Sequence, residues 1–346
     1  MLDESKREPA PPNGARRLID REEDFGHVVE VLSQASVLGI DVEAGIPPRE
    51  RQSKFALLQI AIPGMTFAID PLRLRNLSPL APVMVSETIL KVFHGIALDR
   101  DMMEGAGLSL RYVADLSEVA RSAFGKGEAS LAAFARRAFG VGIDKSLQRS
   151  AWLHRPLDLP NLAYAWRDAE LTLGLFNWSS VHLPDLLALH TSISARTVIP
   201  DTLPTWVQAV LNGSRQPAFD LLAAHGLDID LNAEQVVQDA IEALAAVHLP
   251  YLRGRLLRAI GELELYELVP AVRDLLHARS AVERASAARA LATMGEASAE
   301  ADIRALLDDP TEEVRQAADL ALQLLPQRIV TDTAVGAANA ASGVGA

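Results

Sequence analysis

Residues 37–43 read Val-Leu-Gly-Ile-Asp-Val-Glu, an apolar run that ends in two carboxylates. A second apolar run, Phe-Ala-Leu-Leu-Gln-Ile-Ala-Ile, fills residues 55–62, and Thr-Phe-Ala-Ile-Asp follows at 66–70. Pro63 and Gly64 separate the last two runs, and this pair of residues is typical of a hairpin turn. The three runs therefore predict neighbouring β-strands.

The chain then alternates strand and helix signals. Residues 90–94 (LKVFH) predict a fourth strand. Helical patterns follow around residues 97–105, 116–124, 130–139 and 161–182. Close strands followed by strands alternating with helices predict an α/β domain, a mixed sheet with flanking helices, which we place at residues 17–185.

The strand signal ends at about residue 185, and Ala and Leu then recur at helical spacing. The segment 283–291 (ERASAARAL) is echoed by 314–322 (VRQAADLAL), so the sequence repeats at roughly 31–34 residues. This part of the chain resembles HEAT-like repeats. We expect an all-α helical-repeat domain over residues 186–328, and such repeats usually offer a surface for a protein or nucleic-acid partner.

Composition excludes several classes of protein. The 346 residues hold 33 Lys and Arg against 45 Asp and Glu, so a net charge of −12 argues against a general coat for duplex nucleic acid. The absence of cysteine excludes disulfides, thiolate zinc sites and cysteine nucleophiles. We find neither a signal peptide nor a membrane-spanning run, and we expect a cytoplasmic protein with disordered ends at 1–16 and 329–346.

Three short motifs bring together groups that could do chemistry. Asp41 and Glu43 alternate along a strand and so lie on the same face, and Asp99 follows a strand and turn. Tyr164 and Asp168 are four residues apart, which places them on one face of a helix. Taken singly, each motif has an ordinary structural explanation: surface acids, an acid near a helix N-terminus, and a structural hydrogen bond.

The order of the motifs is more informative than any one of them. A strand with D-x-E, a strand and turn with H-x4-D, and a helix with Y-x3-D together resemble the DEDD exonucleases of the tyrosine subclass, ribonuclease D in particular. The segments 54–61, 115–117 and 143–157 also resemble parts of that family. The resemblance covers about residues 17–182 and implies a ribonuclease H-like core.

The resemblance also implies a reaction. Asp41, Glu43, Asp99 and Asp168 would bind two divalent cations, Mg²⁺ or Mn²⁺, which prefer oxygen ligands. Asp41, Glu43 and Asp168 would hold the cation that activates water, and Asp41 with Asp99 would hold the cation beside the leaving oxygen. Tyr164 would orient the attacking water. We expect hydrolysis of the terminal 3′ phosphodiester of RNA to nucleoside 5′-monophosphates.

Binding of the single-stranded 3′ end needs local positive charge in this acidic protein. Lys145 and Arg149 belong to a basic stretch at residues 135–155, and we interpret both as substrate-binding. Gln59 and His94 are the other candidate substrate contacts, and each also has a structural interpretation.

Three arginines lie close together in the helical part of the chain. Arg253, Arg255 and Arg258 form either a basic stripe that guides RNA or the charged ends of repeat helices, and we favour the second interpretation.

Two other functions stay open. The same chemistry could act on DNA, because contacts to the 2′-hydroxyl cannot be located in the sequence. The chain could also be a non-catalytic scaffold for nucleic acid or protein, with a vestigial exonuclease core. Ala44 and Ala151 occupy positions where the family commonly has a bulky and an acidic residue, respectively, and Ile46 is a candidate replacement for the bulky one.

Overall fold

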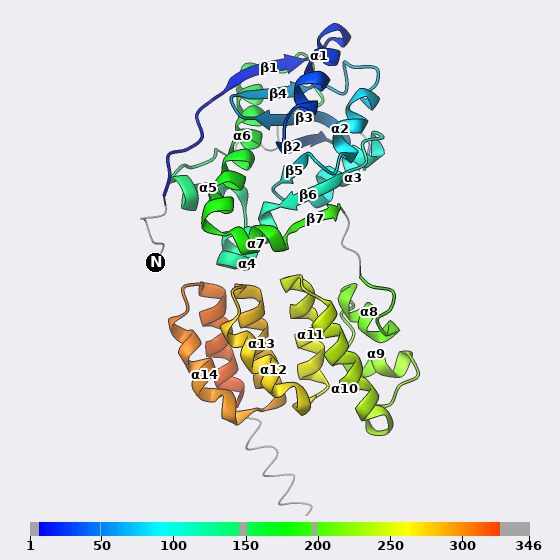
Figure 1. Ribbon diagram of the computed structural model, residues 1–346, viewed down its shortest axis with the longest axis vertical. Coiled ribbons are helices and arrows are strands. Elements are labelled where there is room, and N and C mark those ends of the chain that lie inside the picture. The colour runs from blue at the N-terminus through cyan, green and yellow to red at the C-terminus, as the bar shows by residue number, and fades with distance from the viewer. Residues whose placement is uncertain (1–6, 49, 145–150, 196–198, 326–346) are drawn as a thin grey trace, which may run out of the picture. The chain divides into compact units, whose positions relative to one another are not determined.

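A computed structural model describes residues 7–48, 50–144, 151–195 and 199–325. The chain divides into two compact units, which comprise residues 1–120 with 128–197 and residues 121–127 with 198–346 (Figure 1). We call them the sheet unit and the helical unit and describe each by itself.

The sheet unit is built on a mixed sheet that has seven strands in the described part of the chain, in the order β1-β4-β3-β2-β5-β6-β7 (Figure 1). The strands are β1 (Ala15–Ile19), β2 (Val37–Gly45), β3 (Lys54–Ile62), β4 (Met65–Ile69), β5 (Leu90–Phe93), β6 (Arg111–Asp115) and β7 (Thr191–Ser194). Strand β3 is antiparallel to β2 and β4, and β7 is antiparallel to β6, whereas the other neighbours are parallel.

Helices cover both faces of this sheet. They are α1 (Glu22–Ser33), α2 (Ala81–Val85), α3 (Ile96–Gly105), α4 (Leu116–Phe124), α5 (Leu131–Phe139), α6 (Leu159–His182) and α7 (Pro184–Leu189), with 3₁₀ turns at Ser78–Leu80 and Lys126–Glu128. The boundary between the two units falls inside α4. The mixed sheet with flanking helices confirms the α/β class expected from the sequence.

Alternation along the central strands separates two apolar cores. Even-numbered residues such as Ile40, Leu58 and Ile60 pack with buried side chains of α1, α2 and α3. Odd-numbered residues face helix α6: Leu57 packs near Ala165, and Ala61 packs near Ala169 and Leu173. Any odd-numbered polar residue of β2 or β3 is therefore directed toward α6.

The structure adds three strands that the sequence did not predict. The four predicted strands correspond to β2, β3, β4 and β5, and the Pro63-Gly64 turn joins β3 to β4 with φ +80° at Gly64. The additional strands are β1, β6 and β7. Because β7 lies at Thr191–Ser194, the sheet continues past residue 185, where we expected it to end.

The N-terminal segment corrects a second expectation. We expected residues 1–16 to be disordered, but residues 7–16 pack along helices α5 and α6, while residues 1–6 lie outside the described part. The amide of Glu8 donates to the carbonyl of Ala138 (2.9 Å), and Arg167 donates to the carbonyl of Pro11 (2.8 Å). The Pro11 ring fills a notch at Gly174, where a Cβ would lie 2.6 Å from it. These contacts offset the ordering entropy of the segment.

The helical unit has no strand among its described residues. Its helices are α8 (Thr205–Leu211), α9 (Ala218–Ala224), α10 (Ile229–Ala246), α11 (Pro250–Glu262), α12 (Val269–Asp274), α13 (Ala281–Met294), α14 (Glu300–Ala305) and a helix over residues 312–325, with 3₁₀ turns at Tyr266–Leu268, Leu275–His277, Ala297–Ala299 and Leu306–Asp308. One continuous apolar core runs through the unit. None of the helices in the described ranges of the chain is long and apolar enough to cross a membrane.

Arginines recur in the helical unit at matching positions. Arg253, Arg284 and Arg315 are spaced 31 residues apart, and each donates to a backbone carbonyl of the segment before its own helix. The acceptors are Leu244 in the last turn of α10, Ala278 and Asp309. Arg284 also makes two hydrogen bonds to the buried carboxylate of Asp309, at 2.7 and 3.0 Å. The periodicity seen in the sequence therefore coincides with a recurring contact in the structure.

Candidate active site

Strand β2 presents two carboxylates to helix α6. Asp41 and Glu43 are odd-numbered, so they lie on the sheet face that α6 covers. The register of β2 against β3 shifts between Glu43 and Ala44, which marks a β-bulge immediately after the second carboxylate. Ala56 of β3 is the extra residue, and the pairing resumes with Ala44 opposite Phe55 and Gly45 opposite Lys54. Bulges re-aim the side chains beside them.

Helix α6 brings Tyr164 and Asp168 to the same place. Asp158 caps the helix by accepting a hydrogen bond from the amide of Asn161 (2.8 Å). The helix approaches β2 closely at Gly39, where a Cβ would lie 2.7 Å from the Cβ of Leu173 and 2.8 Å from the carbonyl oxygen of Ala169. Gly39 lies two residues before Asp41 on β2, and Ala169 lies one residue after Asp168 on α6. The contact between them therefore places the two acids close together.

Three carboxylates form a cluster that fits a hard divalent cation. Asp41, Glu43 and Asp168 each offer an oxygen, and these oxygens all lie within 4.8 Å of one another. Glu43 and Asp168 are buried, and Oδ1 of Asp168 is buried without a hydrogen-bond partner in the ranges that the structure describes. Among the described residues no basic side chain forms an ion pair with these three acids. A cation is the group that would satisfy such a set of oxygens.

Burial and mutual repulsion raise the pKa values of the clustered acids. Burial, and then the charges of Asp168 and Asp99, raise the pKa of Glu43 to about 9. Burial is also the largest cause for Asp41, whose pKa is raised well above its usual value. It raises the pKa of Asp99 to about 7 and that of Asp168 to about 6. Asp99 lies outside the group of three but close enough to repel Asp41 and Glu43.

Asp115 fixes the turn that carries Asp99. Its Oδ1 accepts hydrogen bonds from the amide of Gly95 (2.9 Å) and from the amide and hydroxyl of Ser117, and its Oδ2 accepts one from the amide of Ile96 (3.3 Å). Gly95 has φ +95° and Ile96 begins α3, so this carboxylate caps the helix from the neighbouring strand. The role of Asp115 follows from the sheet order and is not visible in the sequence pattern.

Tyr164 is held against Asp168 and over Trp152. Its phenol hydrogen-bonds to the Asp168 carboxylate, which lowers the pKa of Asp168 against the effect of burial. Burial raises the pKa of Tyr164 above its usual value, and the charge of Asp168 adds to the shift, so the phenol stays protonated. The rings of Trp152 and Tyr164 are 6.2 Å apart. The side chain at this position is therefore a fixed hydrogen-bond donor.

The four candidate substrate contacts are placed differently. Gln59 is fully buried on β3 directly opposite Asp41, so none of its atoms is open to a substrate in this conformation. His94 follows β5, and burial lowers its pKa to about 4, so the ring is neutral at pH 7. Lys145 and Arg149 lie outside the described residues. Substrate binding by these four residues stays a prediction.

Most other basic candidates are engaged within their own unit. Arg155, from the basic stretch, forms an ion pair with Asp70 at 2.5 Å. In the helical unit Arg253 pairs with Glu283 (2.8 Å), Arg255 donates to the carbonyl of Leu211, and Arg258 pairs with Glu262 (2.7 Å). These contacts agree with the interpretation of the three arginines as structural groups on the helices.

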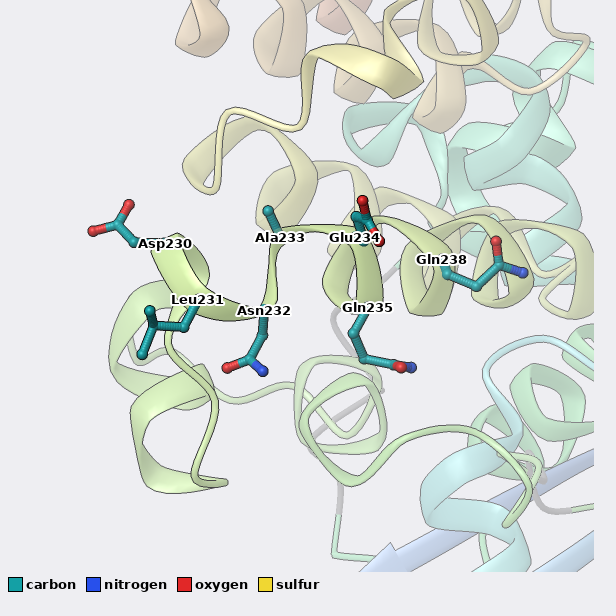
Figure 2. Close-up of a pocket in the computed structure, with 7 residues that line it drawn as sticks. All are labelled: Asp230, Leu231, Asn232, Ala233, Glu234, Gln235 and Gln238. Carbon is teal, nitrogen blue, oxygen red and sulfur yellow. The ribbon is translucent and has the colours of Figure 1, made fainter.

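A hollow of about 530 Å³ lies along α10 in the helical unit, beside a break in helical geometry at Asn232 (Figure 2). Its lining residues are Asp230, Leu231, Asn232, Ala233, Glu234, Gln235 and Gln238. The lining includes two acids and no basic side chain, so it is unsuited to a phosphate.

Comparison with known proteins supports the expected activity. Residues 17–178 match the family model described as 3′–5′ exonuclease. The matched segment covers slightly less than half of the chain. Within it lie all of the clustered acids and Tyr164. Residues 198–346 of the helical unit lie outside the match.

Two curated relatives and one solved structure are similar to the chain. Ribonuclease D of Desulfotalea psychrophila is 26% identical over 203 residues, which is 58% of this chain and 50% of that protein. Ribonuclease D of Zymomonas mobilis is 32% identical over 148 residues, which is 42% of this chain and 38% of that protein. The catalytic core of RRP6 from Trypanosoma brucei has a TM-score of 0.47 at 19% identity, covering 96% of this chain and 86% of that one. This chain thus spans half or less of the length of the two ribonucleases D.

Proposed function

We propose that this protein is a metal-dependent 3′–5′ exonuclease that hydrolyses RNA from its 3′ end and releases nucleoside 5′-monophosphates. The observation that carries the proposal is the cluster of Asp41, Glu43 and Asp168 inside the domain that matches 3′–5′ exonucleases. RNA is the favoured substrate because the similar curated proteins are named ribonuclease D.

The cations would be held by the clustered acids. Asp41, Glu43 and Asp168 would hold one Mg²⁺ or Mn²⁺, and Asp41 with Asp99 would hold a second. When bound, the cations would stabilise the negative charge that develops at the scissile phosphate. The protein supplies the oxygens in a fixed arrangement, because β2, α3 and α6 each hold their acids by backbone and packing contacts described above.

Tyr164 would position the attacking water. Its protonated phenol already hydrogen-bonds to Asp168, so the hydroxyl is oriented toward the cluster. A neutral phenol cannot act as a base at pH 7, and its contribution is a hydrogen bond that fixes the direction of attack.

Exposed apolar side chains flank the acids and suit an unpaired nucleotide. Ile46 follows β2 and is 62% exposed, and Leu98 precedes Asp99 on α3 and is 58% exposed. Apolar side chains at these positions can contact bases that are not stacked in a duplex. This supports the single-stranded 3′ end as the substrate, with His94, Lys145 and Arg149 as proposed further contacts.

We also propose that the helical unit is a stack of HEAT-like repeats that binds a protein or nucleic-acid partner. The recurrence of Arg253, Arg284 and Arg315 at a spacing of 31 residues supports a repeat. We propose a cytoplasmic location, as expected from the sequence.

The test is digestion of a 5′-labelled single-stranded RNA in Mg²⁺ or Mn²⁺, with the matching DNA beside it. We expect a ladder of products that shortens from the 3′ end and release of nucleoside 5′-monophosphates. EDTA and Asp168→Asn should abolish the activity, and Tyr164→Phe should lower the cleavage rate at least about 100-fold. Asp101→Asn is the matched control, because Asp101 is an acid of α3 that pairs with Arg100 outside the cluster.

Other outcomes of the same assay contradict the proposal. Cleavage of DNA alone would replace RNA by DNA as the substrate. Digestion by Asp168→Asn at the wild-type rate would show that the activity belongs to a contaminant. No cleavage of either polymer by folded, metal-loaded protein would favour the non-catalytic scaffold.

A further inference from the structure

Gln59 is a buried amide without a hydrogen bond to any described residue. It lies in the middle of β3, its side chain is 0% exposed, and neither Oε1 nor Nε2 has a hydrogen-bond partner in the described part of the chain. Leaving a buried polar group unpaired costs on the order of 1–3 kcal/mol, and such groups are rare in folded proteins. An apolar residue of similar size would avoid this cost, so the amide calls for a functional explanation.

The position of Gln59 supplies one. In the antiparallel pair of β2 and β3, Gln59 is directly opposite Asp41, and such partners have Cβ atoms about 4.5–5.5 Å apart. Both residues are odd-numbered and lie beneath α6, between the apolar contacts of Leu57 and Ala61. The amide is therefore enclosed beside one carboxylate of the cluster and is separated from solvent.

The chemistry of the two side chains is complementary. A primary amide offers two N–H donors, and a carboxylate that holds a cation accepts about four hydrogen bonds, of which the cation replaces only some. Carboxylates that bind metals are commonly held by such second contacts, which fix their orientation.

We propose that Gln59 is a positioning residue, which donates an N–H to the carboxylate of Asp41 when a divalent cation is bound and so holds that ligand in place. This inference rests on the proposed function. Gln59 contributes to cation affinity through Asp41 and does not touch the substrate. Without a cation the amide stays unpaired, so it lowers the stability of the metal-free protein.

The experiment compares Gln59→Leu with wild type in two measurements. In the metal-free protein we expect Gln59→Leu to raise Tm, because it removes an unpaired buried amide. In a calorimetric titration with Mn²⁺ we expect its affinity to fall roughly 10- to 100-fold. A residue that only fills space would lower Tm when replaced and would leave Mn²⁺ affinity unchanged. Unchanged affinity would overturn the inference.

Ser179→Ala is the matched control. Ser179 is another fully buried residue, and its side-chain oxygen has no hydrogen-bond partner among the residues that the structure describes, but it lies eleven residues beyond Asp168 on α6. Its replacement should leave Mn²⁺ affinity at the wild-type value. If Gln59→Leu fails to fold, Gln59→Met keeps the length of the side chain and carries the same expectation. Failure of wild type itself to bind Mn²⁺ would instead contradict the proposed function, which keeps the two failures apart.

Discussion

The guanidinium of Arg155 donates two hydrogen bonds to the carboxylate of Asp70. Its Nε donates to Oδ2 at 2.5 Å and its Nη2 donates to Oδ1 at 2.8 Å, with the two side chains 15% and 2% exposed. The same guanidinium donates to the carbonyls of Trp152 and Ala56, both at 2.6 Å. This buried pair therefore ties the segment before α6 to β3 and to the end of β4. Through Trp152 it also supports the ring of Tyr164.

Breaking the pair should destabilise the sheet unit. Asp70→Asn leaves a buried guanidinium without its counter-charge, so we expect a loss of about 3 kcal/mol in the free energy of unfolding. Glu50→Gln is the control, since the Lys54–Glu50 pair is about half exposed and should contribute less than about 1 kcal/mol. Urea unfolding measures both. Equal, small effects would show that the buried pair is not structural.

The contact between α6 and β2 should be sensitive to one methyl group. Gly39→Ala would push the Cβ into Leu173 and Ala169, costing about 1–3 kcal/mol and moving Asp168 away from Asp41. We therefore expect a lower Tm together with weaker Mn²⁺ binding. Gly26→Ala is the matched control: nothing lies within 4 Å of its Cβ on helix α1, so it should stabilise by about 0.5–1 kcal/mol. Wild-type Mn²⁺ affinity in Gly39→Ala would contradict this account.

The part of the fold that carries the site was predictable because its signals are local. The strands β2 and β3 are continuous apolar runs, and the alternation of Asp41 and Glu43 places them on one face. Helix α6 has a long helical pattern with a capping Asp158. Nothing in the sequence, however, shows that α6 lies on the side of the sheet to which these acids point; the packing of α6 against β2 and β3 shows it.

Two of the three missed strands, β1 and β7, lack such local signals. Strand β1 reads Ala-Arg-Arg-Leu-Ile, with one buried residue, and β7 reads Thr-Ser-Ile-Ser, with none. Both lie at the edges of the sheet and are stabilised by pairing with β4 and β6, segments distant in the chain. For the same reason the partner of Arg155, 85 residues away, and the partners of Asp115 could not be predicted from spacing.

The acid cluster should make the metal-free protein less stable at high pH. Burial raises the pKa of Glu43 from 4.5 in a free chain to about 9, so folding favours the protonated carboxyl. A group with a raised pKa contributes its stability below the lower value and loses it as pH rises through the upper one. We therefore expect Tm in EDTA to fall between pH 5 and 9. The fall of Tm with pH should be smaller in Glu43→Gln and the same as in wild type in Asp101→Asn. An equal fall of Tm with pH in wild type and both variants would contradict the raised pKa of Glu43.

The arginines of α11 should matter for stability and not for RNA binding. Arg258 pairs with Glu262 and donates to the carbonyl of Ser214 (3.0 Å), so Arg258→Gln should lower Tm. In EDTA, which prevents cleavage, the salt dependence of RNA binding between 50 and 200 mM should match wild type. Arg136→Gln removes an exposed charge of the basic stretch. It should reduce the slope of the logarithm of the RNA binding constant against the logarithm of salt concentration by about 0.7, the contribution of one phosphate contact on a single strand. The reverse pattern, a smaller slope for Arg258→Gln alone, would move the RNA contacts to the helical unit.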